Sequence, residues 1–322
     1  MINIKPFKTG DSTKWNTLVS DANNGTIFHL REFLGYHPPN RFLDQSILFY
    51  KKELPFVPFP AAEKIIDGQK WLISHPGASM GSFVVPENLS IADSFLLTEA
   101  LVKHAKEKNY KGIRITLPPV VYQKRPSNYL DFTLLKSGFT YVKREITSVL
   151  FLEDSMEKNL KKFKETHRRA VKRAVKMGVD VRRSDDFTSF YKILERNLKI
   201  RHDVTPTHTL EELQHLHAIY PDDIHLFAAY VDNTMIAGVV NFIVNHRVVL
   251  AFYISHDEQF QDYRAVNLLF YKTFEWAISK NFQLFDFGIF TVNEEPNMGL
   301  GRFKENFGAS GIFRDTLELK LP

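Results

Sequence analysis

The spacing of apolar and polar positions predicts strands and helices along the whole chain. In the second half, short apolar runs bounded by turn residues predict three strands, at 225–231, 235–244 and 248–255. Apolar residues at helical spacing predict four longer helices, at 156–177, 187–199, 209–218 and 265–280. The first half contains the same two kinds of element, which indicates a fold built from both.

A repeat relates the two halves of the chain. Residues 92–115 and 265–287 each contain a long helix, a Lys-Asn-aromatic corner and a strand. Residues 132–139 and 302–309 each contain a short helix that ends at a glycine, followed by the start of a closing strand. A repeat of this size indicates duplication. We therefore expect an α/β fold (an α+β mixed sheet) with helices on both faces of the sheet.

The composition agrees with a soluble protein of two domains. The chain has 322 residues, 44% hydrophobic and 25% charged, so two domains, expected at 1–152 and 153–322, can each bury a core. Cysteine is absent, which excludes disulfides, thiolate metal sites and a cysteine nucleophile. The start of the chain does not resemble a signal peptide, and no apolar stretch approaches a membrane span, so we expect a cytoplasmic protein.

A carboxylate falls inside an apolar strand near the end of the chain. Asp286 lies in the expected strand 284–288, and the amphipathic helix that stops at Gly308 contains Lys304. Because burial of an unpaired charge is costly, we expect these two side chains to lie together. One interpretation is a structural pair between strand and helix. The other is a catalytic site, in which Asp286 takes a proton from an attacking amine and Lys304 stabilises an oxyanion or a phosphate.

Several short motifs keep an order and spacing that, together with the repeat, resemble a known family. They are Ser74-His75-Pro76-Gly77 with Gly81, Arg168 to Val179, Arg201-His202, Tyr253-Ile254-Ser255, Asp286-Phe287-Gly288, and Phe303-Lys304 with Phe307-Gly308. The chain resembles, over nearly its whole length, the FemAB-like proteins, which are built from two tandem GNAT-type acyltransferase domains. The resemblance implies that fold and the activity of aminoacyl-tRNA-dependent peptidyltransferases, which extend cell-wall peptides. The coiled-coil arm of some family members is not visible in this sequence.

The same motifs supply further candidate site residues. Tyr253 could donate a proton to a leaving group, or it could be a core aromatic of its strand. Arg201 and His202 follow a predicted helix, where a loop pair can reach a substrate cleft or only cap the surface. The resemblance adds Phe303 and Phe307 to the candidates for substrate binding.

The first half contributes a glycine-rich turn at 74–82. His75 and Ser79 lie on it. Free backbone N–H groups in such a turn could bind an anionic part of a substrate. The alternative is a turn with no ligand.

The predicted helix 156–177 has a strongly basic face. Its candidate phosphate-binding residues are Lys161, Lys162, Arg168, Arg169, Lys172 and Arg173. Apolar residues hold the other side, so the basic side is expected to face outward. This face is either a solvated surface or the contact for a phosphate-rich partner, namely a tRNA acceptor stem, a nucleotide-linked precursor or an anionic membrane surface.

The segment at 255–264 bears on the acyl donor. Ordinary GNAT enzymes cradle the acyl-CoA pyrophosphate with a glycine-containing loop at this place. Here the segment has no glycine and three acids, which argues against acetyl-CoA. His208, His215 and His217 cluster in sequence without acids at ligand spacing, so no metal site is expected.

We therefore expect an acyltransferase that joins an activated acyl or aminoacyl group to an amine by direct attack. The donors considered are aminoacyl-tRNA and acyl-CoA, and the acceptor is a small-molecule or peptide amine, including a cell-wall peptide precursor. Two alternatives remain open. One is a catalytically silent duplicate that binds nucleic acid or an anionic surface, and the other is an ordinary acetyl-CoA-dependent N-acetyltransferase.

Overall fold

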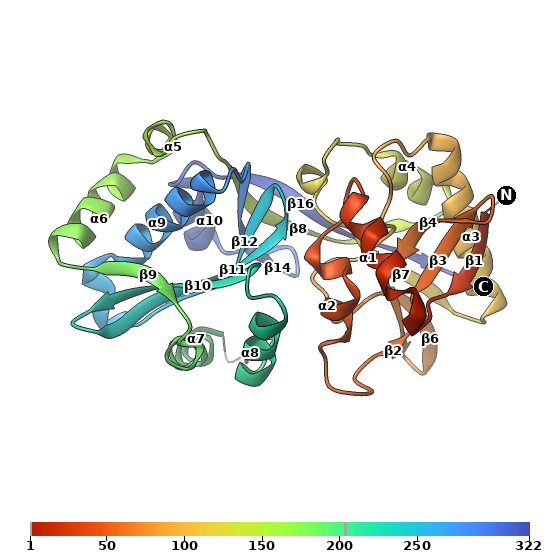
Figure 1. Ribbon diagram of the computed structural model, residues 1–322, viewed down its shortest axis with the longest axis horizontal. Coiled ribbons are helices and arrows are strands. Elements are labelled where there is room, and N and C mark those ends of the chain that lie inside the picture. The colour runs from red at the N-terminus through yellow and green to blue at the C-terminus, as the bar shows by residue number, and fades with distance from the viewer. Residues whose placement is uncertain (1, 203–204) are drawn as a thin grey trace. The chain divides into compact units, whose positions relative to one another are not determined.

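The computed structural model describes residues 2–202 and 205–322, with only the backbone described at 199–202 (Figure 1). Contacts group the chain into two compact units, Met1–Glu145 with Phe313–Pro322, and Ile146–Ile312. The division into domains at 1–152 and 153–322 stays a prediction.

The first unit contains two sheets. A small antiparallel sheet has the order β1-β3-β4, with β1 at Ile2–Pro6, β3 at Ile47–Lys51 and β4 at Leu54–Phe59. The second sheet has the order β2-β5-β6-β7-β16, with bounds Leu43–Asp44, Ala61–Ile66, Gln69–Ser74, Gly112–Thr116 and Ser310–Lys320. The helices are α1 (Ser12–Asp21), α2 (Arg31–Gly35), α3 (Ile91–Glu107) and α4 (Tyr129–Lys136).

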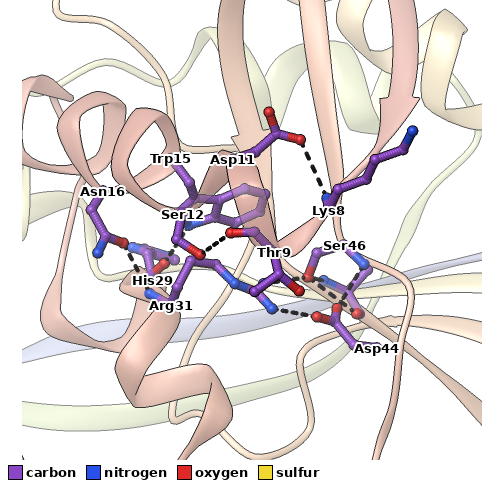
Figure 2. A network of polar contacts seen from close by, with 11 residues as sticks. Lys8, Thr9, Asp11, Ser12, Trp15, Asn16, His29, Arg31, Asp44 and Ser46 are labelled. Carbon is purple, nitrogen blue, oxygen red and sulfur yellow. Dashed lines mark hydrogen bonds and ion pairs between the residues drawn. The ribbon is translucent and has the colours of Figure 1, made fainter.

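A polar network joins α1 and α2 to the strands of the first unit (Figure 2). The Arg31 guanidinium donates to Ser46 Oγ at 3.0 Å and forms an ion pair with Asp44. Trp15 Nε1 donates to the carbonyl of His29 at 2.7 Å. Burial alone would raise the pKa of Asp44, but the Arg31 charge and the Ser46 hydrogen bonds outweigh burial and hold that pKa below its usual value. The network therefore fixes the start of β3 without leaving a buried charge unpaired.

The second unit has a large mixed sheet with helices on both faces, and a small antiparallel pair, β14 (Thr291–Val292) with β15 (Glu295–Pro296). The strand order of the large sheet is β9-β10-β11-β12-β13-β8, with bounds Asp180–Ser184, Ile224–Val231, Thr234–Asn245, Val248–His256, Leu284–Ile289 and Thr140–Phe151. The helices are α5 (Met156–Lys162), α6 (Glu165–Lys176), α7 (Phe187–His202), α8 (Leu210–Ile219), α9 (Ala265–Ser279) and α10 (Met298–Glu305). In Figure 1, α6 and α9 lie on one side of this sheet, and α7 and α8 on the other.

The repeat read from the sequence is present in the structure. In the first unit β6, α3 and β7 form a parallel strand–helix–strand crossover, with Trp71 opposite Gly112. In the second unit β12, α9 and β13 form the same crossover, with Val248 opposite Leu284. The predicted α/β fold with a mixed sheet is thus confirmed.

Two expectations about secondary structure were wrong, and two strands were missed. The helix predicted at 156–177 is two helices, because Phe163 and Lys164 are extended, with ψ of 136° and 151°. Strand β9 and strand β1 were not predicted. Helix α7 continues to His202, so the backbone of Arg201 and His202 belongs to its last turn, and their side chains lie outside the described residues.

Candidate active site

The second unit has a wedge between β12 and β13, which we name the β12–β13 wedge. The two parallel strands pair only from Val248–Leu250 to Leu284–Asp286. Strand β12 also shifts register against β11, because Val240 pairs with Tyr253 and Asn241 with Ala251. Phe252 therefore forms a bulge. Bulges of this kind re-aim backbone groups and are frequent beside active sites.

A second irregularity lies on β13, opposite this bulge. The pairing of β13 with β8 shifts between Asp286 and Ile289, and Gly288 adopts a φ of +76°. Such a left-handed conformation favours glycine. Asp286 Oδ1 accepts the N–H of Gly288 at 2.7 Å and also the hydroxyl proton of Thr147 on β8. The carboxylate therefore holds the kink in place.

Lys304 completes this arrangement from α10. Its Nζ donates to the carbonyls of Gly288 and Ile289, at 2.7 and 2.8 Å. Asp286 is 0% exposed and Lys304 is 1% exposed. The structure thus brings the two predicted residues together at one kink, and both are engaged with the backbone rather than with solvent. Their opposite charges offset the cost of burying each alone.

Tyr253 lies just beyond the β12 bulge and is paired with His208. The backbone N–H of His208 donates to the Tyr253 hydroxyl oxygen at 3.0 Å, and His208 Nδ1 lies 2.7 Å from the same oxygen. Burial raises the pKa of Tyr253 to about 12. The hydroxyl is therefore a proton donor at neutral pH. Sequence reasoning noticed His208 only as part of a histidine-rich segment, and no local pattern connects it to Tyr253.

Helix α7 supplies a further polar contact that the sequence did not suggest. Asn197 Nδ2 donates to Ser255 Oγ at 2.8 Å and to the carbonyl of His256 at 2.6 Å. These bonds fix the end of β12 to α7. A buried asparagine inside a helix gives no sequence signal, since only the tertiary structure shows its partner.

The aromatic candidates lie in the core behind the kink. Phe307 is 0% exposed, and Phe303 is partly buried. The Phe307 ring stacks on Phe287, with centroids 5.6 Å apart, and Phe303 meets Phe307 edge-on at 5.3 Å. These ring contacts pack α10 against β13.

His75 and Ser79 belong to the turn after β6 in the first unit. His75 Nδ1 accepts the N–H of Gly77 at 3.3 Å, and burial lowers the pKa of His75 to about 4. Ser79 is partly exposed on the same turn. A side chain at Gly77 would collide with His37, because a Cβ there would lie 2.0 Å from His37 Nε2. Glycine is therefore needed here for packing.

The basic candidates lie on α5 and α6, and five of the six form ion pairs. Lys161 pairs with Glu157, Lys162 with Glu153, Arg168 and Arg169 with Glu165, and Arg173 with Asp262. Lys172 is exposed, as is Lys176 one turn further along the same helix. The outward face of α6 keeps a net positive charge, because the single carboxylate of Glu165 pairs with both Arg168 and Arg169.

The segment before α9 is a short 3-10 helix, Glu258–Tyr263, without glycine. Its acids are held by arginines, since Arg196 pairs with Asp257 at 3.3 Å and Arg173 with Asp262 at 3.6 Å. The segment therefore lacks the glycine turn expected of a pyrophosphate cradle, and Arg196 and Arg173 are already engaged by its acids. Among the described residues, no group of three or more His, Asp or Glu side chains could hold a metal ion. No described helix has the length and apolar character needed to cross a membrane.

Known proteins share this fold. Residues 161–305 match the acetyltransferase (GNAT) domain family, and this range includes strands β9 to β13, the Phe252 bulge, the Gly288 kink and α10. Over 99% of this chain and 97% of the other, the structure is similar to FemX, with a TM-score of 0.75 and 14% identity. A tandem GNAT protein from the clavulanic acid biosynthesis pathway is similar over 99% and 98%, with a TM-score of 0.56 and 11% identity. No curated protein matches the chain by sequence.

A third structure is the C-terminal domain of a lysylphosphatidylglycerol synthetase from Agrobacterium fabrum, described as putative in its name. It is similar over 96% of this chain and 91% of that domain, with a TM-score of 0.61 and 10% identity. Together these similarities show the fold. The chain has the tandem GNAT fold of the FemAB-like proteins, and its second half carries a GNAT domain, the domain of acyltransferase enzymes.

Proposed function

We propose that the protein is an acyltransferase that moves an activated acyl or aminoacyl group onto an amine, with the β12–β13 wedge as the reaction site. The observation that carries this proposal is the wedge itself: two parallel strands of a GNAT domain diverge after Leu250 and Asp286, and Phe252 bulges at the point of divergence. A wedge of this kind can admit an extended acyl group between the strands.

The chemistry needs no covalent intermediate with the enzyme. The amine nitrogen attacks the acyl carbonyl, an amide bond forms, and the ester or thioester bond to the donor breaks. Backbone N–H groups near the Phe252 bulge stabilise the oxyanion of the tetrahedral intermediate. The attacking nitrogen gives up one proton and the leaving oxygen or sulfur takes one, so the transfer consumes no net proton.

Tyr253 is the proton donor that this geometry favours. It follows the bulge on β12, and His208 fixes its hydroxyl. Asp286 and Lys304 were expected as base and oxyanion donor. Because both are buried at the Gly288 kink, we propose that they act mainly by holding β13 away from β12.

For the donor, we propose an aminoacyl-tRNA or another phosphate-rich carrier in preference to acyl-CoA. Two features support this choice, the basic outward face of α6 and the glycine-free segment before α9. The acceptor we propose is a peptide amine such as a cell-wall peptide precursor, as the resemblance to FemAB-like proteins implies. A catalytically silent protein that binds anions through α6 is the rival function, favoured by that basic face alone.

The test is transfer of a labelled acyl group to free amines, with aminoacylated bulk tRNA and acetyl-CoA offered separately. We expect label to move from the tRNA and not from acetyl-CoA. Transfer from acetyl-CoA alone would overturn the choice of donor. No transfer from either donor, combined with salt-dependent binding of tRNA, would favour the silent protein.

A further inference from the structure

The C-terminal turn of α10 is held by the start of α6. The last carbonyls of a helix have no partners within it and must find them elsewhere. Here the carbonyl of Phe303 accepts His167 Nε2–H at 3.1 Å, and the carbonyl of Asn306 accepts the N–H of Lys164 at 2.8 Å. The extended residues between α5 and α6 thus contact the end of α10 and supply hydrogen-bond donors to its last carbonyls.

The surroundings of His167 hold its ring in place to bond the Phe303 carbonyl. Its side chain is nearly buried, and its ring contacts those of Phe303 and Phe307, with centroids 5.2 and 4.4 Å apart. Its Nε2 must carry a proton to donate to a carbonyl, which defines the tautomer of the neutral ring. Phe163, at the break between the helices, meets Phe307 edge-on at 5.0 Å. Ring contacts and one directional bond together fix the last turn of α10.

This turn carries Lys304, the residue after Phe303. The Lys304 ammonium reaches across to the carbonyls of Gly288 and Ile289. A shift of the turn by about one ångström would move the ammonium out of hydrogen-bond range of both. The position of Lys304 therefore depends on what holds the Phe303 carbonyl.

We propose that His167 is a positioning residue that holds Lys304 on the β13 kink and so couples helix α6 to the β12–β13 wedge. The proposal rests on the proposed function only in that the wedge is the reaction site. The basic face of α6 then has a second role. An anion bound at Lys172 and Lys176 contacts the same helix whose first turn positions Lys304 at the wedge.

The test is hydrogen–deuterium exchange of the full chain, compared between three variants. His167→Leu fills the space without a donor, His167→Gln keeps a donor of similar reach, and His217→Leu is the control. His217 likewise bonds a backbone carbonyl, that of Ile224, at 2.8 Å, but from α8 to β10. If His167→Leu does not fold, His167→Asn, which is too short to reach the carbonyl, takes its place.

We expect amide exchange in peptides covering 286–290 and 303–308 to rise about tenfold in His167→Leu, since one buried hydrogen bond is lost. His167→Gln should stay near wild type, and His217→Leu should leave these peptides unchanged. Unchanged exchange in His167→Leu, or an equal rise throughout the second unit, would overturn the proposal. Hydrogen–deuterium exchange needs no turnover. A protein without transferase activity would therefore contradict the proposed function, but its exchange rates would still test the positioning role of His167.

A kinetic readout then connects the positioning role to the reaction. If the wedge is the site, His167→Leu lowers kcat with little change in KM, and His167→Gln restores it. Loss of kcat in both variants alike would contradict a role for the Phe303 hydrogen bond.

Discussion

Asp286 and Lys304 meet at the backbone of Gly288. The carboxylate accepts its N–H, and the ammonium donates to its carbonyl, each at 2.7 Å. A buried acid and a buried base thus hold the two sides of one kinked peptide segment. The kink keeps β13 from continuing alongside β12, and the wedge follows from it.

Removal of the Lys304 charge should therefore cost stability as well as activity. Lys304→Met leaves the two carbonyls and the Asp286 charge buried with fewer partners, so we expect a loss of about 2–4 kcal/mol in the free energy of unfolding. Arg302→Met, two residues earlier on the exposed side of α10, is the matched control. Urea titration measures both. Equal stability of the two variants would contradict the buried role of Lys304.

The Asp286→Asn variant separates charge from geometry. The amide oxygen can still accept from Gly288 and Thr147, so the fold should hold, while the charge opposite Lys304 is lost. Because Lys304 then lies buried without the opposing carboxylate charge, we expect a loss of about 1–3 kcal/mol in stability and a fall of about tenfold in transfer through a loosened kink. Wild-type turnover measured in this variant would remove Asp286 from the site.

Gly308 ends α10 under two constraints. Its φ is +92°, and a Cβ there would lie 2.6 Å from Lys162 Cβ. Gly308→Ala should therefore lower the free energy of unfolding by about 1–3 kcal/mol. Gly299→Ala in the same helix has no positive φ and no close contact, and it should raise stability by up to about 1 kcal/mol. Thermal unfolding of the pair checks the opposite signs.

His29 predicts how stability depends on pH. Burial lowers its pKa from 6.5 to about 4. The neutral ring is required, because Nδ1 accepts the N–H of Thr26 and Nε2 donates to the carbonyl of Gly81. A lowered histidine pKa means that the stabilisation is complete above pH 6.5 and is lost as pH falls toward 4.

The neutral His29 ring contributes about 3 kcal/mol at most to the free energy of unfolding. Urea unfolding of wild type and His29→Gln, followed by fluorescence of the neighbouring Trp15, measures it across this pH range. We expect the difference between the two proteins to shrink as pH falls. A difference independent of pH would show that the histidine does not titrate as its burial requires.

The basic face of α6 should bind polyanions through Lys172 and Lys176. Charge reversal of both, Lys172→Glu with Lys176→Glu, should weaken binding of bulk tRNA and reduce the slope of log affinity against log salt by about two. The control reverses Lys158 and Lys161 on α5, which already pair with Asp154 and Glu157. Equal losses in both double variants would indicate only general charge attraction.

Most of the architecture could be predicted because it depends on local sequence patterns. The repeat, the β13 strand and the glycine stops depend on spacing and on single residues. Gly138, Gly178 and Gly308 all adopt a positive φ, as expected of residues that end helices. The proximity of Asp286 and Lys304 followed from the cost of burying a charge.

The remaining features depend on contacts between distant residues. The break between α5 and α6 has no proline or glycine, and it occurs where the N–H of Lys164 finds the carbonyl of Asn306. Tyr253 and His208 are 45 residues apart, and neither suggests the other. The bulge at Phe252 is a matter of register, which depends on which strands become neighbours.

The most direct test of the account is transfer by a protein whose wedge has been altered at Gly288. Gly288→Val places a branched side chain at a φ of +76°, with its Cβ 3.6 Å from the carbonyl oxygen of Ala251 on β12. Gly68→Val imposes the same backbone strain, at a φ of +74°, on a hairpin turn of the first unit with open space around it. We predict that labelled acyl transfer is lost in Gly288→Val and kept in Gly68→Val. Transfer at the wild-type rate in a folded Gly288→Val protein would contradict the claim that the β12–β13 wedge is the reaction site.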